Sequence, residues 1–153
     1  MPEIARQTNS RSFRETEDFG RALAEFFLAG EVKDRATVIF LRGDLGAGKT
    51  VLSRGFLSAF GVRRVLSPTF TLAKRYSVKL QDKTRGNVYH LDAYRLKKEH
   101  ISQVGLSDMR KERGAFILVE WPENFGKAPF DAAVELRHGS SEEERSIILE
   151  LRP

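Results

Sequence analysis

The residues whose types and spacing most clearly indicate chemistry lie between Gly43 and Thr50. This segment reads GDLGAGKT and fits the pattern G-x-x-x-x-G-K-[ST], which forms a phosphate-binding loop (P-loop) in many nucleotide-binding proteins. In such a loop the glycines permit a tight turn, successive N–H groups line an anion site, and the following helix adds positive potential. Lys49 would contact the β- and γ-phosphates, and the Thr50 hydroxyl would ligate Mg²⁺. The residues expected to contact a nucleotide are Asp44, Leu45, Gly46, Ala47, Gly48, Lys49, Thr50 and Val51.

A nucleotide site of this kind needs an acidic residue that helps to hold Mg²⁺. Two acids follow apolar runs: Glu120 after FILV, and Asp92 within VYHLDAY. Glu120 is the better candidate, because a buried parallel strand delivers its last residue to the phosphate-binding edge of the sheet. The alternative for Glu120 is a surface carboxylate at a strand end. Trp121, next to it, could be either a site residue or an ordinary core or edge aromatic.

The segment YHLDAY places polar residues at every second position. In a strand His90, Asp92 and Tyr94 would share one face, and three polar residues on one face are unusual for a core. Such a face would suit a site where Asp92 orients or deprotonates an attacking water, with His90 nearby. An exposed hairpin face is the alternative. Arg95 could supply charge to a phosphate, although most arginines simply face solvent.

The segment LSPTFTL (66–72) follows the helix expected after the P-loop, where nucleotide hydrolases place a mobile switch segment. Its candidate switch residues are Ser67, Pro68, Thr69 and Phe70. The alternative is a loop that merely opens a strand. The chain contains no N-K-x-D motif for guanine, which favours adenine, and no long arginine-rich lid of the kind that a small-molecule kinase would use.

Hydrophobic patterning predicts the elements that position these residues. A helix is expected over 13–30, with Thr16 as N-cap and Gly30 as stop, and a second over 49–60. The apolar runs 36–43 and 115–121 predict strands buried on both faces. Hairpins are expected at 69–78 with 87–94 and at 132–139 with 145–152, and a weaker helix at 97–109. The predicted fold class is α/β, a three-layer P-loop NTPase fold with a mixed, partly antiparallel central sheet.

Length, charge and composition narrow the class of protein. The 153 residues predict a single domain over 1–153, with 1–11 as a flexible N-terminal tail. The absence of cysteine excludes disulfide partners and thiolate metal sites. No apolar run suits a secretory signal or a membrane span, so a cytoplasmic protein is expected.

The net charge is +5, with basic clusters at 62–64, 73–76, 95–98 and 109–113. These clusters could attract a phosphate-bearing partner, or could be an ordinary solvated surface.

Four blocks together resemble one family. GDLGAGKT, SPTFTL, YHLDAYRL and VEWPE occur in the order and roughly the spacing of the TsaE family (older name YjeE), and the resemblance spans about Ser12 to Leu151. It implies a small ATPase of the bacterial cytoplasm, needed for threonylcarbamoyladenosine at position 37 of tRNAs that read ANN codons. A TsaD–TsaB heterodimer would transfer the group, and TsaE would bind that pair. ATP hydrolysis, weak in the isolated protein, would support repeated turnover.

The resemblance also implies roles for individual residues and a pair of cofactors, ATP and Mg²⁺. By motif, Thr50 and Glu120 are Mg²⁺ ligands, Lys49 and the loop amides hold the phosphates, and Asp92 is the hydrolytic residue. Residues 67–70 are the switch-like loop, and Trp121 sits beside the metal acid. Two other functions are weighed against this one: an independent small-molecule kinase, and a nucleotide-gated binding module without enzymatic activity.

Overall fold

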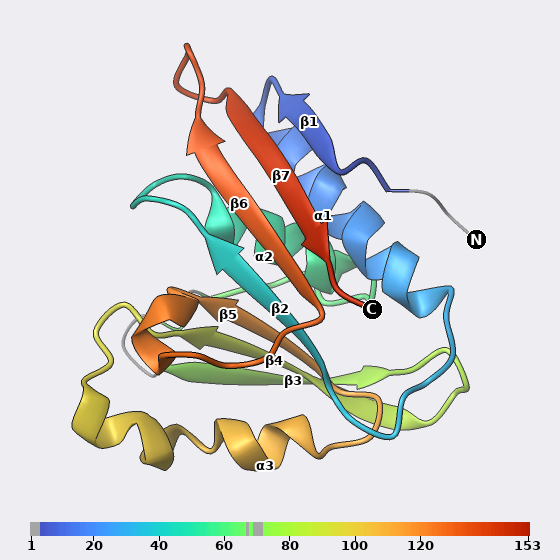
Figure 1. The fold of residues 1–153 in the computed structure, drawn as a ribbon. Helices are drawn as coiled ribbons and strands as arrows, with labels where there is room; N and C mark the ends of the chain where they lie inside the picture. The colour runs from blue at the N-terminus through green and yellow to red at the C-terminus, as the bar shows by residue number, and fades with distance from the viewer. Residues whose placement is uncertain (1–3, 67, 69–71) are drawn as a thin grey trace.

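The computed structural model describes residues 4–66, 68 and 72–153. Among these residues seven strands form one sheet in the order β1-β7-β6-β2-β5-β4-β3 (Figure 1). The strands are β1 (Gln7–Ser10), β2 (Thr37–Arg42), β3 (Ala73–Lys79), β4 (Arg85–Asp92), β5 (Phe116–Glu120), β6 (Ala132–His138) and β7 (Arg145–Leu151). The helices are α1 (Phe13–Leu28), α2 (Lys49–Ser58) and α3 (Leu106–Arg110), with 3-10 helices η1 (Lys98–Val104) and η2 (Pro122–Phe125).

The sheet is mixed, as the sequence predicted. Its centre is parallel, since β2 pairs in parallel with both β5 and β6, and β4 pairs in parallel with β5. Antiparallel partners extend both sides: β3 beside β4, and β7 followed by β1 beside β6. Both expected hairpins are therefore confirmed as the pairs β3–β4 and β6–β7, although residues 69–71 of the first predicted strand lie outside the described residues.

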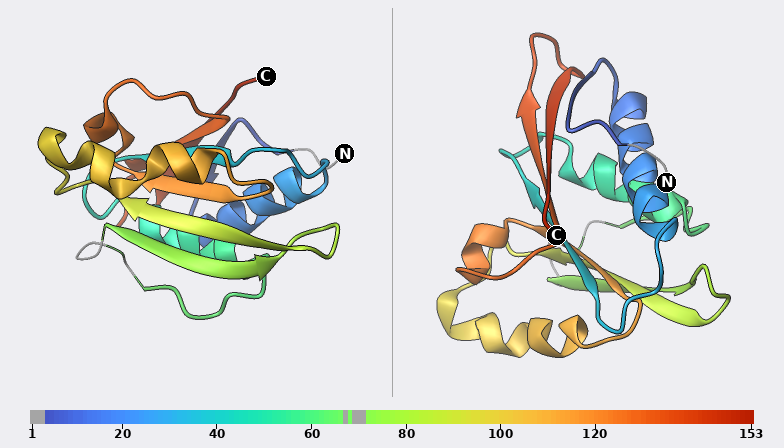
Figure 2. Two further views of the ribbon diagram at one scale, coloured as in Figure 1. Left: turned by 90° about the horizontal axis from the view of Figure 1, so that it is seen from below. Right: turned by 45° about the vertical axis from the view of Figure 1, so that its right-hand side comes forward.

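Alternating side chains of the central strands enter two cores, one on each face of the sheet. Ile39 and Leu41 of β2 join α1 and α2 in the first core, whereas Val38 and Phe40 face the second, which η2 and α3 help to cover. Figure 2 shows the two layers, with α1 and α2 on one side of the sheet and α3 on the other. Burial on both faces explains why β2 and β5 read as continuous apolar runs. The three-layer arrangement is confirmed.

The two helices of the first layer approach closely at two glycines. A Cβ added to Gly20 of α1 would lie 2.0 Å from the carbonyl oxygen of Leu52, and one added to Gly55 of α2 would lie 1.8 Å from that of Glu17. Glycine at both positions therefore lets the backbones touch, which presses the start of α1 against the start of α2.

The N-terminal segment differs from the sequence prediction. Residues 7–10 are not part of a flexible tail but form β1, paired antiparallel with β7, because the exposed edge of β7 offers backbone partners. The N-cap of α1 is Ser12, whose side chain accepts a hydrogen bond from the N–H of Glu15, so the expected Thr16 cap is wrong. Thr16 is buried instead, and its hydroxyl lies 2.6 Å from that of Ser10.

The region predicted as a helix over 97–109 is divided. Gly105 adopts a left-handed conformation with φ 80°, which ends η1 and precedes the five-residue α3. Glycine reaches this conformation without steric cost, so the helix breaks where the sequence carries it. In the part of the chain described, no helix is long and apolar enough to cross a membrane.

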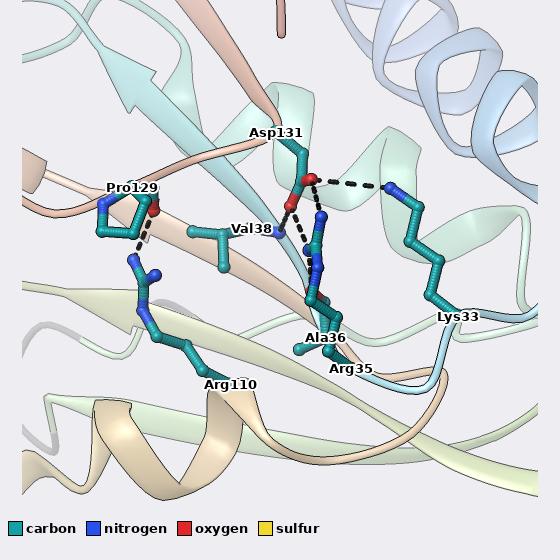
Figure 3. Close-up of polar contacts among 7 residues, drawn as sticks. All are labelled: Lys33, Arg35, Ala36, Val38, Arg110, Pro129 and Asp131. Carbon is teal, nitrogen blue, oxygen red and sulfur yellow. Dashed lines mark hydrogen bonds and ion pairs between the residues drawn. The ribbon is translucent and has the colours of Figure 1, made fainter. Parts of the chain in front are cut away.

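A buried carboxylate fastens the start of β2 to the segment before β6. Asp131 accepts hydrogen bonds from Arg35 at 2.7 and 3.0 Å and from the N–H of Val38 at 2.8 Å (Figure 3). Lys33 lies 3.5 Å away. Burial acts to raise the pKa of Asp131, but these hydrogen bonds and positive charges outweigh it and leave the pKa below its usual value.

Candidate functional site

The glycine-rich loop (residues 43–50) connects β2 to α2 at the end of the sheet where β4 and β5 also finish (Figure 1). Strand register brings the acidic residues to this edge: Asp92 is paired with Glu120, and Glu120 with Leu41 of β2. Glu120 was expected at a strand end, whereas Asp92 was expected within a strand and instead ends β4. Parallel pairing explains why these two residues, far apart in the chain, meet here.

A cavity of about 470 Å³ lies between the glycine-rich loop and these strand ends. This volume falls within the range of small-molecule sites. Its lining residues are Phe13, Leu45, Gly46, Ala47, Gly48, Lys49, Thr50, Val51, Asp92, Tyr94, Arg95, Glu120 and Trp121. Most of the described residues that were singled out from the sequence therefore line one cavity. Asp44 belongs to the same loop but does not line the cavity, and His90 lies beneath it.

Two glycines give the loop its shape. Gly43 has φ 150°, and a Cβ there would lie 2.6 Å from the carbonyl oxygen of Leu136 on β6. Gly48 has φ 106° and precedes α2, where no side chain caps the helix. The first N–H groups of α2 thus lack the usual side-chain acceptor, and such a helix start suits an anionic ligand.

The Lys49 side chain is folded back onto the loop. Its ammonium donates to the carbonyl oxygens of Gly43 and, at 3.1 Å, Asp44, and it lies 4.1 Å from the centre of the Trp121 ring. Burial lowers the pKa of Lys49, while the nearby carboxylates, Glu120 first and then Asp92, act in the opposite direction. The ammonium is therefore held at the cavity wall, close to the acids.

The two acids are nearly buried, with Asp92 8% and Glu120 4% exposed. This excludes the alternatives of an exposed hairpin face and a surface carboxylate. Asp92 accepts a hydrogen bond of 3.0 Å from the N–H of Tyr94. The Nε2 of His90, a fully buried side chain, lies 2.7 Å from Glu120 Oε2, while its Nδ1 has no hydrogen-bond partner among the described residues. His90 thus contacts the acid and does not approach the open cavity.

Aromatic residues form one wall of the cavity. Trp121 has φ 56°, a left-handed conformation that is uncommon for a large side chain, and its ring lies 4.9 Å from that of Tyr94. Tyr94 was expected on the face of the strand, but β4 ends at Asp92 and Tyr94 lies beyond it. Arg95 also lines the cavity.

The predicted switch segment falls mostly outside the described residues. Ser67, Thr69 and Phe70 are not described, whereas Pro68 is buried. The role expected for this segment stays a prediction.

Several residues at the site were not predicted from the sequence. Asn124 of η2 donates to the carbonyl oxygen of Ala93 at 2.7 Å, which holds the chain just after Asp92. Arg145 of β7 contacts the carbonyl oxygens of Gly46 and Ala47, and Phe13 lines the cavity. None of them lies in a recognisable motif, so only the three-dimensional arrangement reveals them.

The site suits a magnesium nucleotide by its donor chemistry. Thr50 and Glu120 offer oxygen ligands, which Mg²⁺ prefers, and the uncapped start of α2 with Lys49 offers positive potential for phosphates. The described residues contain no cluster of three or more His, Cys, Asp or Glu that could hold a metal by themselves.

Known proteins resemble this chain in sequence and in fold. The protein from Haemophilus influenzae named tRNA threonylcarbamoyladenosine biosynthesis protein TsaE is 37% identical over 107 residues, which cover 69% of this chain and 63% of the relative. The protein of that name from Bacillus subtilis is 36% identical over 108 residues, covering 70% and 60%. The alignments thus span about three fifths of these relatives' lengths. The crystal structure of Bacillus subtilis YdiB superposes with a TM-score of 0.67 at 26% identity, covering 95% of this chain and 85% of that one.

A family model also matches most of the chain. The model described as threonylcarbamoyl adenosine biosynthesis protein TsaE matches residues 10–147, from β1 to within β7. That range includes the glycine-rich loop, both acids and Trp121. The chain therefore belongs to the TsaE family.

Proposed function

We propose that the cavity binds ATP with Mg²⁺ and hydrolyses the nucleotide. The observation that carries this proposal is the convergence of Lys49, Thr50, Asp92 and Glu120 on one cavity beside an uncapped helix start. The Lys49 ammonium donates to carbonyl oxygens of its own loop. Bound phosphates would replace these carbonyls as its hydrogen-bond acceptors. The backbone N–H groups of the loop would share the remaining charge.

In this proposal each side chain has a distinct task. Thr50 and Glu120 would hold Mg²⁺, which, when bound, neutralises charge on the phosphates. Asp92, which is nearly buried and lines the cavity, would orient or deprotonate the attacking water. His90 would keep the Glu120 carboxylate in place through their contact.

We further propose that ATP hydrolysis serves the formation of threonylcarbamoyladenosine at position 37 of tRNA in the cytoplasm. Family membership and the names of the relatives support this assignment. We assign the transfer of the threonylcarbamoyl unit to a TsaD–TsaB heterodimer, as the family resemblance implies, with tRNA contacted through that pair. Slow hydrolysis by the isolated chain and faster hydrolysis with the pair are expected.

An ATPase assay of wild type, Lys49→Ala and Asp92→Asn, each with and without the TsaD–TsaB pair, tests the proposal. We expect the pair to stimulate wild type and Lys49→Ala to bind ATP more weakly. Asp92→Asn should bind ATP without hydrolysing it, because the amide cannot accept a proton. Absence of both binding to the pair and stimulation would overturn the partner assignment.

The same proteins separate the alternatives when the phosphate acceptor and tRNA modification are measured. Transfer of the γ-phosphate to a metabolite rather than to water would indicate a small-molecule kinase. Full support of tRNA modification by Asp92→Asn would indicate a nucleotide-gated binding module in which hydrolysis is dispensable.

A further inference from the structure

A buried arginine that is not part of the cavity wall holds the glycine-rich loop by its backbone carbonyls. Arg145, the first residue of β7, is 4% exposed, and its guanidinium donates to four backbone carbonyl oxygens. Two belong to the loop: Nε contacts Ala47 at 2.8 Å and Nη2 contacts Gly46 at 3.0 Å. Nη1 donates at 2.7 Å to the carbonyls of Glu142 and of Glu144, in the connection between β6 and β7.

These contacts fix two successive peptide planes of the loop. In a trans peptide unit the C=O and the N–H of the next residue point in opposite directions, and all described peptide bonds are trans. The carbonyl of Gly46 is fixed together with the N–H of Ala47, which closes the loop by donating to Asp44 at 3.0 Å. The carbonyl of Ala47 is fixed together with the N–H of Gly48, which therefore points away from Arg145.

The cavity wall includes the loop but not the guanidinium. Gly46, Ala47 and Gly48 line the cavity, whereas Arg145 does not. Two of the guanidinium nitrogens are occupied by the carbonyls of Gly46 and Ala47, and these hydrogen bonds set which way the loop presents its N–H groups. Phe13, a residue of the cavity wall, packs its ring 5.6 Å from the guanidinium carbon.

The charge of Arg145 strengthens the effect. Among the described residues no carboxylate forms an ion pair with it, so carbonyl dipoles and the Phe13 ring surround this buried cation. A cation bound to a peptide carbonyl polarises that peptide unit and makes its N–H a better donor. Burying an unpaired charge is unfavourable for folding, which argues that the position contributes more than packing.

We propose that Arg145 is a positioning residue for nucleotide binding: it fixes the peptide planes of the glycine-rich loop so that the loop N–H groups are preorganised for phosphates. This role rests on the proposed ATP site. It requires the fork of the guanidinium, because one ammonium cannot span the carbonyls of Gly46 and Ala47 in the same geometry.

Arg145→Lys tests this role, with Arg137→Lys as the matched control. Arg137 lies on the neighbouring β6, is exposed, and contacts only Glu135, at 2.7 Å, among the described residues. For Arg145→Lys we expect the Kd for ATP with Mg²⁺ to rise at least about tenfold, since charge-assisted hydrogen bonds are lost. In the hydrolysis assay KM should rise more than kcat falls. Arg137→Lys should match wild type in both.

Backbone amide NMR of the unliganded proteins gives a readout that does not depend on ATP. Arg145→Lys should shift the resonances of Gly46, Ala47 and Gly48, while residues of β4 and β5 keep their positions. Unchanged loop resonances with an unchanged Kd would overturn the proposal. If wild type binds no ATP, the proposed function fails, and the loop resonances still decide whether Arg145 positions the loop.

Wild-type protein supplies a second measurement in case Arg145→Lys does not fold. The Nε–H of Arg145 should exchange with solvent more slowly than those of exposed arginines and should shift when ATP and Mg²⁺ are added. Fast exchange, or a resonance that does not respond to bound nucleotide, would overturn the role.

Discussion

At the scale of single residues, Lys49 and Trp121 form the unit that should report nucleotide binding. The ammonium lies 4.1 Å from the indole centre and is bonded to carbonyls of its own loop. A phosphate that draws the ammonium away would remove a cation from the ring face, which changes the electrostatic environment of the indole.

Intrinsic fluorescence tests this unit, because Trp121 is the only tryptophan of the chain. We expect ATP with Mg²⁺ to change the emission of wild type in a saturable manner. Lys49→Met, which removes the cation and keeps the length, should alter the emission of the free protein and abolish the response. An identical titration curve for both proteins would contradict the assignment.

The residues that could be named from the sequence are those that hold a fixed place in a motif. Lys49, Thr50, Asp92 and Glu120 could be named from sequence because each occupies a fixed place in a loop or at the end of an apolar run. Arg145 and Asn124 could not be named from the sequence. Each contacts backbone carbonyls of a distant segment, and every residue type carries such a carbonyl.

At the scale of elements, the contact between α1 and α2 sets the position of the glycine-rich loop. The two helices touch at Gly20 and Gly55, where any side chain would overlap the backbone of the neighbour. The first turn of α1 therefore rests against the start of α2, and Thr16 lies near Gly48, where a Cβ would be 3.6 Å from its methyl group.

Gly55→Ala should disrupt this contact. The added methyl must displace the backbone of Glu17, so we expect a loss of about 1–3 kcal/mol in the free energy of unfolding, measured by urea denaturation. Gly30→Ala is the control, because its Cβ would meet only the carbonyl of Phe27 at 3.4 Å. Equal stability of the two variants would show that the helices do not need this close approach.

Most elements could be predicted because their own periodicity specifies them. The buried strands β2 and β5 and the helix α2 depend on local patterns. The strand β1 could not be predicted: its four residues, QTNS, carry no apolar alternation, and it exists because β7 offers an unpaired edge. The position of Thr16 has the same origin, since its buried contact is with Ser10 of β1.

At the scale of the whole molecule, Asp131 links stability to pH. Its carboxylate joins the loop before β2 to the start of β6, and its pKa lies below the usual value. A depressed pKa in the folded state stabilises the protein above the unfolded-state pKa, about 3.9 for aspartate. That contribution is lost as the pH falls through the lower, folded-state pKa.

Asp131→Asn should therefore destabilise the protein at pH 7 by about 2 kcal/mol, because the amide loses the charge-assisted bonds to Arg35. Urea denaturation from pH 7 down to about pH 3 should show the difference between variant and wild type shrinking as the wild-type carboxyl becomes protonated. A difference that stays constant over this range would mean that the charge of Asp131 does not contribute.

The distribution of charge also concerns the molecule as a whole. Some of the basic side chains make contacts within the fold. Arg113 pairs with Asp82 at 2.7 Å, and Arg110 donates to the carbonyl of Pro129. The basic cluster at 109–113 is thus partly committed to internal contacts, which sequence alone could not distinguish from a free surface. This agrees with our assignment of tRNA contact to the partner pair.

The central claim is that the cavity is an ATP site whose Mg²⁺ and phosphate ligands come from the glycine-rich loop and β5. Isothermal titration of the isolated chain with ATP tests it most directly. We predict one ATP per chain, binding that requires Mg²⁺, and a Kd that rises about tenfold to a hundredfold in Lys49→Ala. No binding by wild type, or the same Kd for wild type and Lys49→Ala, would contradict the claim.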